Sequence, residues 1–332
     1  VTQALASTGQ TGFLDHFLAA MEPLARSPLL AGNRVDLLVD GPATYQAMFR
    51  AIADAQHYLY LESFILEDAT VGGMSLARSL QDAADRGVAV YILYDGVGSL
   101  PGANALIAQL HRPSIAACVF NPINPLSDRF AGFNARDHRK IVVVDGAAGF
   151  AGGVNFSRVY RSSSQSVIGQ GRRTLDEGWR DTHVELAGPA VDALEKLFRD
   201  AWASQHCPGT LPPLRSSPSA GAGQTLLRVV ASSPDDELSE IYAAVMAAIT
   251  YAQRSIDITM AYFVPDDALL QALLMAARRG VKVSLVLPAR SNHRLADIAR
   301  EKREQKEKLD RDGCLECRHQ NGGPCGDPQR PA

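Results

Sequence analysis

The chain has 332 residues, of which 46% are hydrophobic and 21% are charged, so it is long enough for two globular domains with ordinary cores. Its formal net charge of −3 gives no general positive field that would favour a nucleic acid as partner. Five cysteines in a chain of this length predict no disulfide framework, and no apolar run reaches the ~20 residues that span a bilayer.

The first predicted element is a helix close to the N-terminus. Its polar face lacks the lysines and arginines of a membrane-surface helix, so packing against a domain is favoured over lying on a membrane. We assign residues 1–30 to this N-terminal helical segment. The apolar residues that recur at helical spacing are Phe13, Leu14, Phe17, Leu18, Met21 and Leu24.

Helices and strands alternate over the next ninety residues. Their order predicts an α/β fold with a parallel sheet covered by helices on both faces. Glu62 lies inside one predicted strand; a buried glutamate there would suit a functional role, but a carboxylate bonded to neighbouring backbone is the safer interpretation. The predicted strands are 35–39, 58–66, 88–94 and 117–120, and the predicted helices are 43–56, 75–86 and 103–111.

The most informative stretch runs from residue 137 to residue 157. Residues 141–144 are four consecutive β-branched residues, which is typical of a buried strand, and Asp145-Gly146 is a strong hairpin-turn signal. Alternation along an extended chain would place His138 and Lys140 on the same face.

Two registers of this hairpin stay open. A loop at residues 146–147 places His138 opposite Asn155, whereas a loop at residues 145–146 places it opposite Gly153. Either register brings an imidazole, the Lys140 ammonium, an amide and glycine backbone close together. These groups suit the binding and cleavage of a phosphate ester.

The spacing of this stretch carries a family resemblance. The pattern His138-x-Lys140-x4-Asp145-x6-Gly152-Gly153-x-Asn155 resembles the signature of the phospholipase D superfamily. The surrounding sequence is similar to that of bacterial cardiolipin synthases over residues 30–300. The segments that carry this similarity are LLVDGPATYQAMFRAI (37–52), YLYLESFILED (58–68), YILYDGVGS (91–99), FNPINPL (120–126) and WRDTHVELAGPAV (179–191).

The resemblance implies a duplicated phospholipase D-like α/β sandwich with a mostly parallel mixed sheet. It also implies a phosphatidyltransferase that forms a phosphohistidine and passes the phosphatidyl group to phosphatidylglycerol, without a metal or other cofactor. His138 would be the nucleophile and Lys140 and Asn155 would hold phosphoryl oxygens, together with the backbone of Gly152 and Gly153.

Three of these residues also have a simpler interpretation. Asp145 is carried over as a catalytic residue, but a turn residue that bonds to local backbone is at least as good an interpretation. Gly152 and Gly153 would also fit a β-bulge, although the resemblance favours phosphate contact.

The rest of the first domain, residues 31–207, contains a strand at 182–186 and a helix at 190–203. His183 at the start of the strand suggests a second catalytic histidine, but the resemblance places it in the scaffold. The arginine-bearing segment 158–178 is either disordered surface or a contact for lipid headgroups.

The second half repeats the first. After a linker at 208–224 that is rich in proline, glycine and serine, AAITYAQRSIDI (247–258) echoes RAIADAQHYLYL (50–61). Likewise, ARRGVKVSLVL (277–287) echoes ADRGVAVYILY (84–94). We therefore expect a second, partial phospholipase D-like domain at 225–300.

The repeat predicts a second His-x-Lys motif, which the sequence does not contain. His138 follows Gly87 by 51 residues, and the same distance from Gly280 reaches residue 331. Residues 301–332 form a charge run and a cysteine-bearing end, which we expect to be a divergent tail unrelated to the family. Its Cys314-x-x-Cys317 with His319 and Cys325 is a weak zinc pattern.

The predicted function is therefore a cardiolipin synthase-like phosphatidyltransferase, impaired by the missing motif. The expected partners are phosphatidylglycerol and a membrane surface, and an oligomer would be one way to supply a second motif. Alternatives are a phosphodiesterase acting on phospholipid or nucleic acid, and a lipid-binding remnant without activity. We expect a location at the periphery of the bacterial inner membrane or in the cytoplasm, with an anchor upstream of Val1 left open.

Overall fold

The computed structural model describes residues 11–100, 102–122, 136–161, 178–214, 220–232, 239–287 and 315–319. The chain divides into two compact units. One unit is Ser27–Asp236, and the other combines Val1–Arg26 with Glu237–Ala332.

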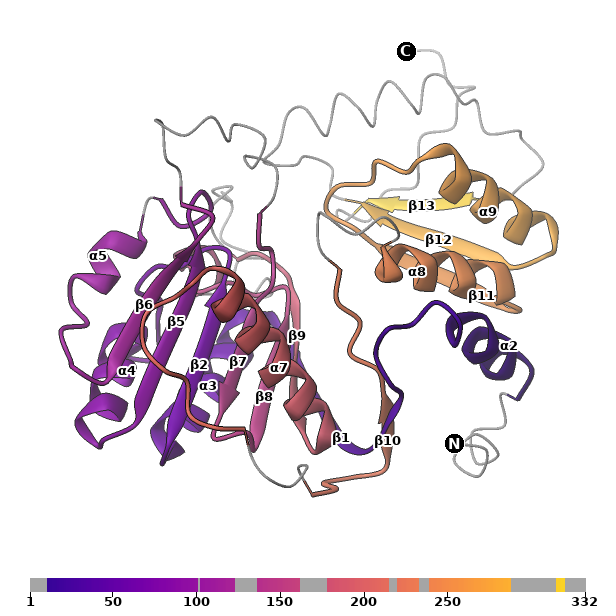
Figure 1. The fold of residues 1–332 in the computed structure, drawn as a ribbon. Coiled ribbons are helices and arrows are strands. Elements are labelled where there is room, and N and C mark those ends of the chain that lie inside the picture. The colour runs from indigo at the N-terminus through magenta and orange to yellow at the C-terminus, as the bar shows by residue number, and fades with distance from the viewer. Residues whose placement is uncertain are drawn as a thin grey trace, which may run out of the picture. The chain divides into compact units, whose positions relative to one another are not determined.

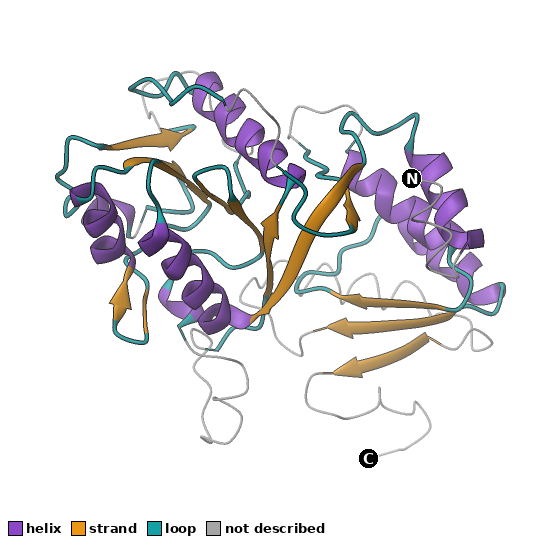
Figure 2. Cartoon of the chain, turned by 90° about the horizontal axis from the view of Figure 1, so that it is seen from below, coloured by secondary structure: helices purple, strands orange, loops and turns teal. Residues whose placement is uncertain are grey.

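The unit Ser27–Asp236 is built on one eight-stranded mixed sheet (Figures 1 and 2). Strands β1, β2, β5, β6 and β8 run in one direction, and β7, β9 and β10 run in the other. From edge to edge the strands are β10 (Thr225–Leu227), β1 (Leu30–Val39), β9 (Thr182–Ala187), β8 (Ala148–Gly152), β7 (Ile141–Val144), β2 (Tyr58–Ser63), β5 (Ala89–Asp95) and β6 (Ile115–Phe120).

Helices cover both faces of this sheet, as the alternating pattern predicts. Helices α3 (Asp40–Asp54), α4 (Leu76–Asp85) and α5 (Ala103–Ile107) contribute to the core on one face, and α7 (Pro189–Ser204) packs on the other. The central strand β2 serves both cores because its side chains alternate. Leu59 and Leu61 point into the first core, and Tyr58 and Tyr60 point into the second.

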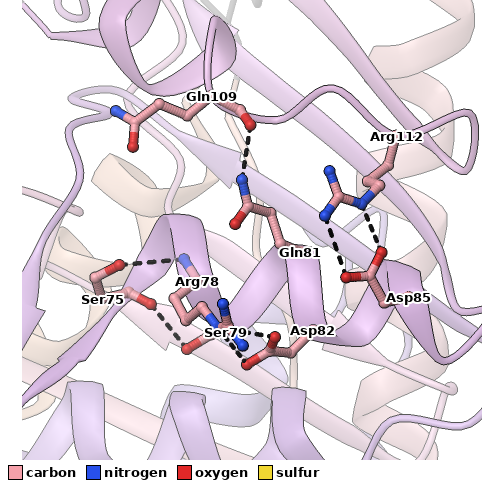
Figure 3. Close-up of polar contacts among 8 residues, drawn as sticks. All are labelled: Ser75, Arg78, Ser79, Gln81, Asp82, Asp85, Gln109 and Arg112. Atoms are coloured by element: carbon pink, nitrogen blue, oxygen red, sulfur yellow. Dashed lines mark hydrogen bonds and ion pairs between the residues drawn. The ribbon is translucent and has the colours of Figure 1, made fainter.

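The surface of α4 shows how local polar contacts fix a helix (Figure 3). The Ser75 hydroxyl accepts a hydrogen bond from the backbone N–H of Arg78 (3.1 Å) and caps the helix N-terminus. At the other end Arg112 forms two hydrogen bonds with the carboxylate of Asp85, at 2.5 and 3.2 Å. The Gln81 amide also donates to the Gln109 carbonyl (2.7 Å), so α4 is tied to the segment that leads from α5 into β6. A two-stranded hairpin, β3 (Thr70–Val71) with β4 (Met74–Ser75), precedes this helix.

The β7–β8 hairpin exists as predicted, but both predicted registers are wrong by one residue. Ile141 pairs with Ala151 and Val144 with Ala148, so the turn contains three residues, 145–147. Asp145 and Gly146 both have positive φ angles, 52° and 57°. Ala147 is then the third residue of the turn, and this extra residue shifts the pairing by one position from either two-residue loop. Strand β7 begins at Ile141, so the His-x-Lys segment precedes the strand.

A disulfide joins two segments that the sequence does not relate to each other. Cys118 on β6 is bonded to Cys207, which follows α7, with the two Cα atoms 5.5 Å apart. The sequence predicted no disulfide framework, and the structure corrects this by showing one disulfide bond. Counting cysteines missed it because only the packing of α7 across the sheet brings these two positions together.

The other unit contains a three-stranded parallel sheet. Its strands are β11 (Ser255–Thr259), β12 (Lys282–Leu287) and β13 (Leu315–His319), in this order. Helices α8 (Glu240–Tyr251) and α9 (Asp267–Arg278) belong to it. Helix α2 (Thr11–Met21) packs against α8, where the rings of His16 and Tyr251 stack 5.6 Å apart. The N-terminal helix therefore packs on a domain, as the sequence favours.

The two units repeat one arrangement. The order α3–β2–α4–β5–β6 recurs as α8–β11–α9–β12–β13. The Arg86 guanidinium after α4 donates to the carbonyl of Ile52 (2.9 Å), and Arg279 after α9 donates to that of Ile249 (3.1 Å). The same long-range contact at the same place in both units supports the duplication that the echoed sequences predict.

The units are bounded differently from the expected domains. Strand β10, expected at the start of the second domain, pairs with β1 in the first sheet. Strand β13 lies inside the expected divergent tail, yet it pairs in parallel with β12 as β6 does with β5.

Candidate active site

His138 lies against an aromatic ring. Its imidazole stacks on the phenyl ring of Phe64, with centroids 3.9 Å apart and an angle of 17° between the planes. Phe64 directly follows β2, and its carbonyl accepts a hydrogen bond from the Ser99 hydroxyl (2.8 Å). A Cβ atom at Gly98 would lie 2.7 Å from the Phe64 ring, so only glycine allows this close packing. Sequence reasoning read residue 64 as part of a strand and missed this contact.

The environment of His138 favours a neutral imidazole. Partial burial, followed by the positive charge of Lys140, lowers the pKa of His138 below its ordinary value. The side chain nevertheless remains exposed. At neutral pH the ring therefore keeps an unprotonated nitrogen that solvent and a substrate reach.

Lys140 shares the same aromatic ring. Its Nζ atom lies 5.4 Å from the centroid of Phe64 and donates a hydrogen bond to the His138 carbonyl (2.5 Å). Burial lowers the pKa of Lys140 to about 8, while Asp137, Asp181 and Asp95 act in the opposite direction. The ammonium is therefore charged in most molecules at pH 7 and lies beside the imidazole, as the motif predicts.

The side chain of Asn155 bonds to the backbone next to Phe64. Its side-chain oxygen accepts a hydrogen bond from the N–H of Ile65 (3.0 Å), the residue after Phe64. The Tyr45 hydroxyl donates to the backbone carbonyl of Asn155 (2.5 Å), and the Asn155 side chain is buried. With its oxygen used in this way, the amide offers N–H donors to an anion.

The two glycines have a steric role in the structure. The N–H of Gly153 donates to the Thr182 carbonyl (2.9 Å), so it is not available to a phosphate. A Cβ atom at Gly153 would overlap the Asp181 carboxylate, and one at Gly152 would lie 2.6 Å from the Cα atom of His183. Because the two glycines lack side chains, Asp181 and the beginning of β9 can pack directly against them.

Asp181 and His183 consequently belong to the electrostatic surroundings of Lys140. Burial raises the pKa of Asp181, and Lys140 opposes that shift. His183 is 0% exposed, and burial, followed by the charge of Lys140, lowers its pKa to about 3. Neither ring nitrogen of His183 has a hydrogen-bond partner among the described residues. The resemblance assigned this histidine to the scaffold, and the structure places it beside Lys140 as a neutral side chain.

The structure does not bring Asp145 to the other motif residues. Its carboxylate accepts hydrogen bonds from the backbone N–H groups of Gln56 (2.7 Å), His57 (2.8 Å) and Tyr58 (2.8 Å). Asp145 follows the last residue of β7, whereas His138 precedes the first. At roughly 3.3 Å per residue, the strand alone separates them by more than about 10 Å. This geometry matches the interpretation of Asp145 as a turn residue.

Glu62 also differs from expectation, because an arginine side chain contacts its carboxylate. Atom Oε1 lies 3.1 Å from Nε of Arg139, the residue between His138 and Lys140.

The described residues show neither a cluster of metal ligands nor a membrane-spanning helix. No group of three or more histidine, cysteine, aspartate or glutamate side chains there is placed to hold a metal ion. No helix in the same part of the chain has both the length and the apolar character needed to cross a bilayer. Cys314 and Cys325 of the weak zinc pattern, and residues 162–177 of the arginine-bearing segment, lie outside the described residues.

Comparison with known proteins gives one family. The family model described as cardiolipin synthase, PLD-like domain, matches residues 48–166 and 245–320. The chain is 37% identical to cardiolipin synthase A of Pseudomonas aeruginosa (strain LESB58) over 295 residues, covering 89% of this chain and 57% of that protein. It is 36% identical to cardiolipin synthase A of Pseudomonas fluorescens (strain SBW25) over 301 residues, covering 90% and 59%.

A solved structure shares the fold. The phosphatidylserine synthase of Haemophilus influenzae aligns with a TM-score of 0.53 and 12% identity, over 92% of this chain and 77% of that one. The predicted α/β fold is thereby confirmed. The chain spans a little more than half the length of the curated relatives it matches.

Proposed function

We propose a function from the premise that this chain belongs to the family of cardiolipin synthase, phospholipase D-like domains. The function is transfer of a phosphatidyl group to phosphatidylglycerol through a covalent phosphohistidine at His138. The observation that carries it is the exposed, neutral imidazole of His138, held on Phe64 beside the ammonium of Lys140.

The first half-reaction uses the unprotonated nitrogen of His138 as the nucleophile. A P–N bond forms, the P–O bond to the leaving alcohol breaks, and the alkoxide takes up a proton. Lys140 and the amide of Asn155 stabilise the charge on the phosphoryl oxygens. In the second half-reaction a hydroxyl of phosphatidylglycerol attacks phosphorus, and His138 is released. Covalent catalysis of this kind divides one difficult step into two easier ones.

The proton for the leaving alkoxide comes from a second group. In the resembled family it is the histidine of a second motif, which the repeat would place near residue 331, outside the described residues. General acid catalysis typically contributes 10²–10⁴ in rate. Without such a group we expect the reaction to be slow, and we do not expect a second copy of the chain to supply the proton donor.

The substrate class places the reaction at a membrane. Both the donor and the acceptor are lipids with two acyl chains, so the catalytic unit would work at the bilayer surface. We assign the protein to the periphery of the bacterial inner membrane, with phosphatidylglycerol as its lipid partner. The relatives named above are bacterial proteins, which is consistent with this location.

The test uses vesicles of phosphatidylglycerol labelled with ³²P, with His138→Asn as control. The reaction is quenched in base, where phosphohistidine survives, and label on the protein is measured. Label on the wild type that disappears in His138→Asn is the expected result. Equal label on both proteins, or vesicle binding without label, would contradict the proposal, and the second outcome would favour a lipid-binding remnant. Labelled single-stranded DNA in a parallel reaction tests the nucleic-acid alternative.

A further inference from the structure

Two buried carboxyl groups and one arginine lie behind the His-x-Lys segment. The residues that alternate with His138 and Lys140 are Asp137 and Arg139. Nε of Arg139 donates to Oδ1 of Asp137 (3.0 Å) and lies 3.1 Å from Oε1 of Glu62. The backbone N–H of Arg139 also donates to Oδ1 of Asp137 (3.0 Å). The guanidinium of Arg139 thus contacts both carboxyl groups.

Strand pairing brings this cluster directly to the motif. Glu62, near the end of β2, pairs with Ile141, the residue immediately after Lys140. Asp137 is held from a third strand, because its N–H donates to the carboxylate of Asp95 (3.1 Å) at the end of β5. The segment 137–140 is therefore held in place through Asp137 and Arg139, the residues that alternate with His138 and Lys140.

The charge of the cluster does not balance if both carboxyl groups are ionised. The side chains of Glu62 and Asp137 are 1% and 5% exposed and that of Arg139 is 31% exposed, so two buried negative charges would face one partly exposed positive charge. Burying such an uncompensated charge is costly, and one proton on a carboxyl group removes it.

The surroundings indicate which group holds that proton. Burial raises the pKa of Glu62 well above its ordinary value, and the nearby Asp137 carboxylate adds to the shift, while Arg139 opposes it. Burial alone would raise the pKa of Asp137 as well. The neighbouring Glu62 and the charge and hydrogen bonds of Arg139 outweigh burial there and lower the pKa of Asp137. No other charged group acts noticeably on Glu62 among the described residues, and Asp200 acts on the cluster only through Arg139.

We infer that Glu62 is a positioning residue that keeps its proton and, through Arg139, holds the backbone that presents His138 and Lys140. The protonated cluster is neutral as a whole. It fixes the two residues that alternate with the motif, so the imidazole and the ammonium stay on the Phe64 side. This inference deepens the proposed function, but its tests below require no catalytic activity.

Infrared spectroscopy tests whether Glu62 keeps its proton. Ordinary carboxyl groups are ionised at pH 7, so a carboxylic acid C=O band that remains at this pH reports a buried protonated group. We expect the band in the wild type, a shift of the band with ¹³C-glutamate but not with ¹³C-aspartate, and its loss in Glu62→Gln. A wild type without the band, or a band that responds to ¹³C-aspartate, would overturn the inference even if the variant fails to fold.

Histidine NMR tests the positioning role. The His138 ring signal is assigned with His138→Asn, and its position and titration midpoint are compared in Glu62→Gln and Glu62→Ala. Glutamine imitates the protonated carboxyl group, so we expect the wild-type signal and midpoint in Glu62→Gln and a shifted signal in Glu62→Ala. Identical signals in all three proteins would show that Glu62 does not position the motif.

Thermal unfolding at different pH values gives a third measurement. The folded state keeps the proton on Glu62 at pH values where the unfolded chain has released it, so this residue lowers stability as pH rises above about 4.3. Glu62→Gln removes this contribution. We therefore expect a flatter dependence of Tm on pH in the variant than in the wild type between pH 5 and the pKa of the buried group. Parallel curves would contradict a proton retained on Glu62.

Discussion

The phenyl ring of Phe64 and the imidazole of His138 lie face to face, with centroids 3.9 Å apart. The same phenyl ring has Nζ of Lys140 5.4 Å from its centroid. One aromatic side chain that is not part of the motif therefore contacts both of the motif's functional groups, and its removal is the first prediction.

Replacing Phe64 with leucine should loosen His138. Aromatic pairs contribute ~0.5–1.5 kcal/mol beyond burial. Loss of this contribution should lower the rate of protein labelling from phosphatidylglycerol about 2- to 10-fold. The pKa of His138 should rise toward its ordinary value, because burial is the main cause of the downward shift. NMR titration of the histidine signal measures it. Phe64→Tyr keeps the ring and should behave as wild type, and an unchanged pKa in Phe64→Leu would contradict the prediction.

The alkaline limit of the labelling reaction should come from Lys140. Its pKa of about 8 means that the ammonium loses its proton as pH rises through 8, and the phosphoryl oxygens then lose a positive charge. Labelling rates relative to pH 7 should therefore fall above pH 8 in the wild type. Lys140→Arg keeps its charge in this range, so its relative rate should not show the fall. A fall at the same pH in both proteins would assign the limit to another group.

Asp145 should matter for stability and not for chemistry. Asp145→Ala leaves the N–H groups of residues 56–58 without their acceptor, which we expect to lower the free energy of unfolding by about 1–3 kcal/mol. Urea unfolding measures this loss. The labelling rate per folded molecule should stay at the wild-type value. A 100-fold lower rate with unchanged stability would instead support the catalytic role that the motif resemblance implies.

The disulfide should stabilise the first unit. It closes a loop of 89 residues between β6 and the end of α7, and bonds of this kind typically contribute ~2–4 kcal/mol. Cys118→Ser should lower the Tm, and a reductant should lower the Tm of the wild type to a similar value while leaving the variant unchanged. A wild-type Tm that does not respond to the reductant, with two free thiols by titration, would show that the bond does not form.

The amino-acid sequence determined the elements and their repetition. The four β-branched residues 141–144 form β7, and the alternation at 58–63 forms β2, because periodicity and β-propensity act within a few neighbouring residues. The echo between residues 50–61 and 247–258 likewise predicted that α3–β2 would recur as α8–β11. The juxtaposition of His138 and Lys140 also followed, because both lie in one short segment.

Only the tertiary structure decided what surrounds that segment. The hairpin register depended on positive φ angles at two consecutive turn residues, which fixed a three-residue loop that the letters Asp-Gly alone did not specify. The contacts of Phe64 with His138 and of Glu62 with Arg139 join positions more than seventy residues apart. Such contacts arise when β2 and β7 pair in one register and the helices close over the sheet. Local patterns contain no information about that packing, whereas burial and charge in the folded unit determine it.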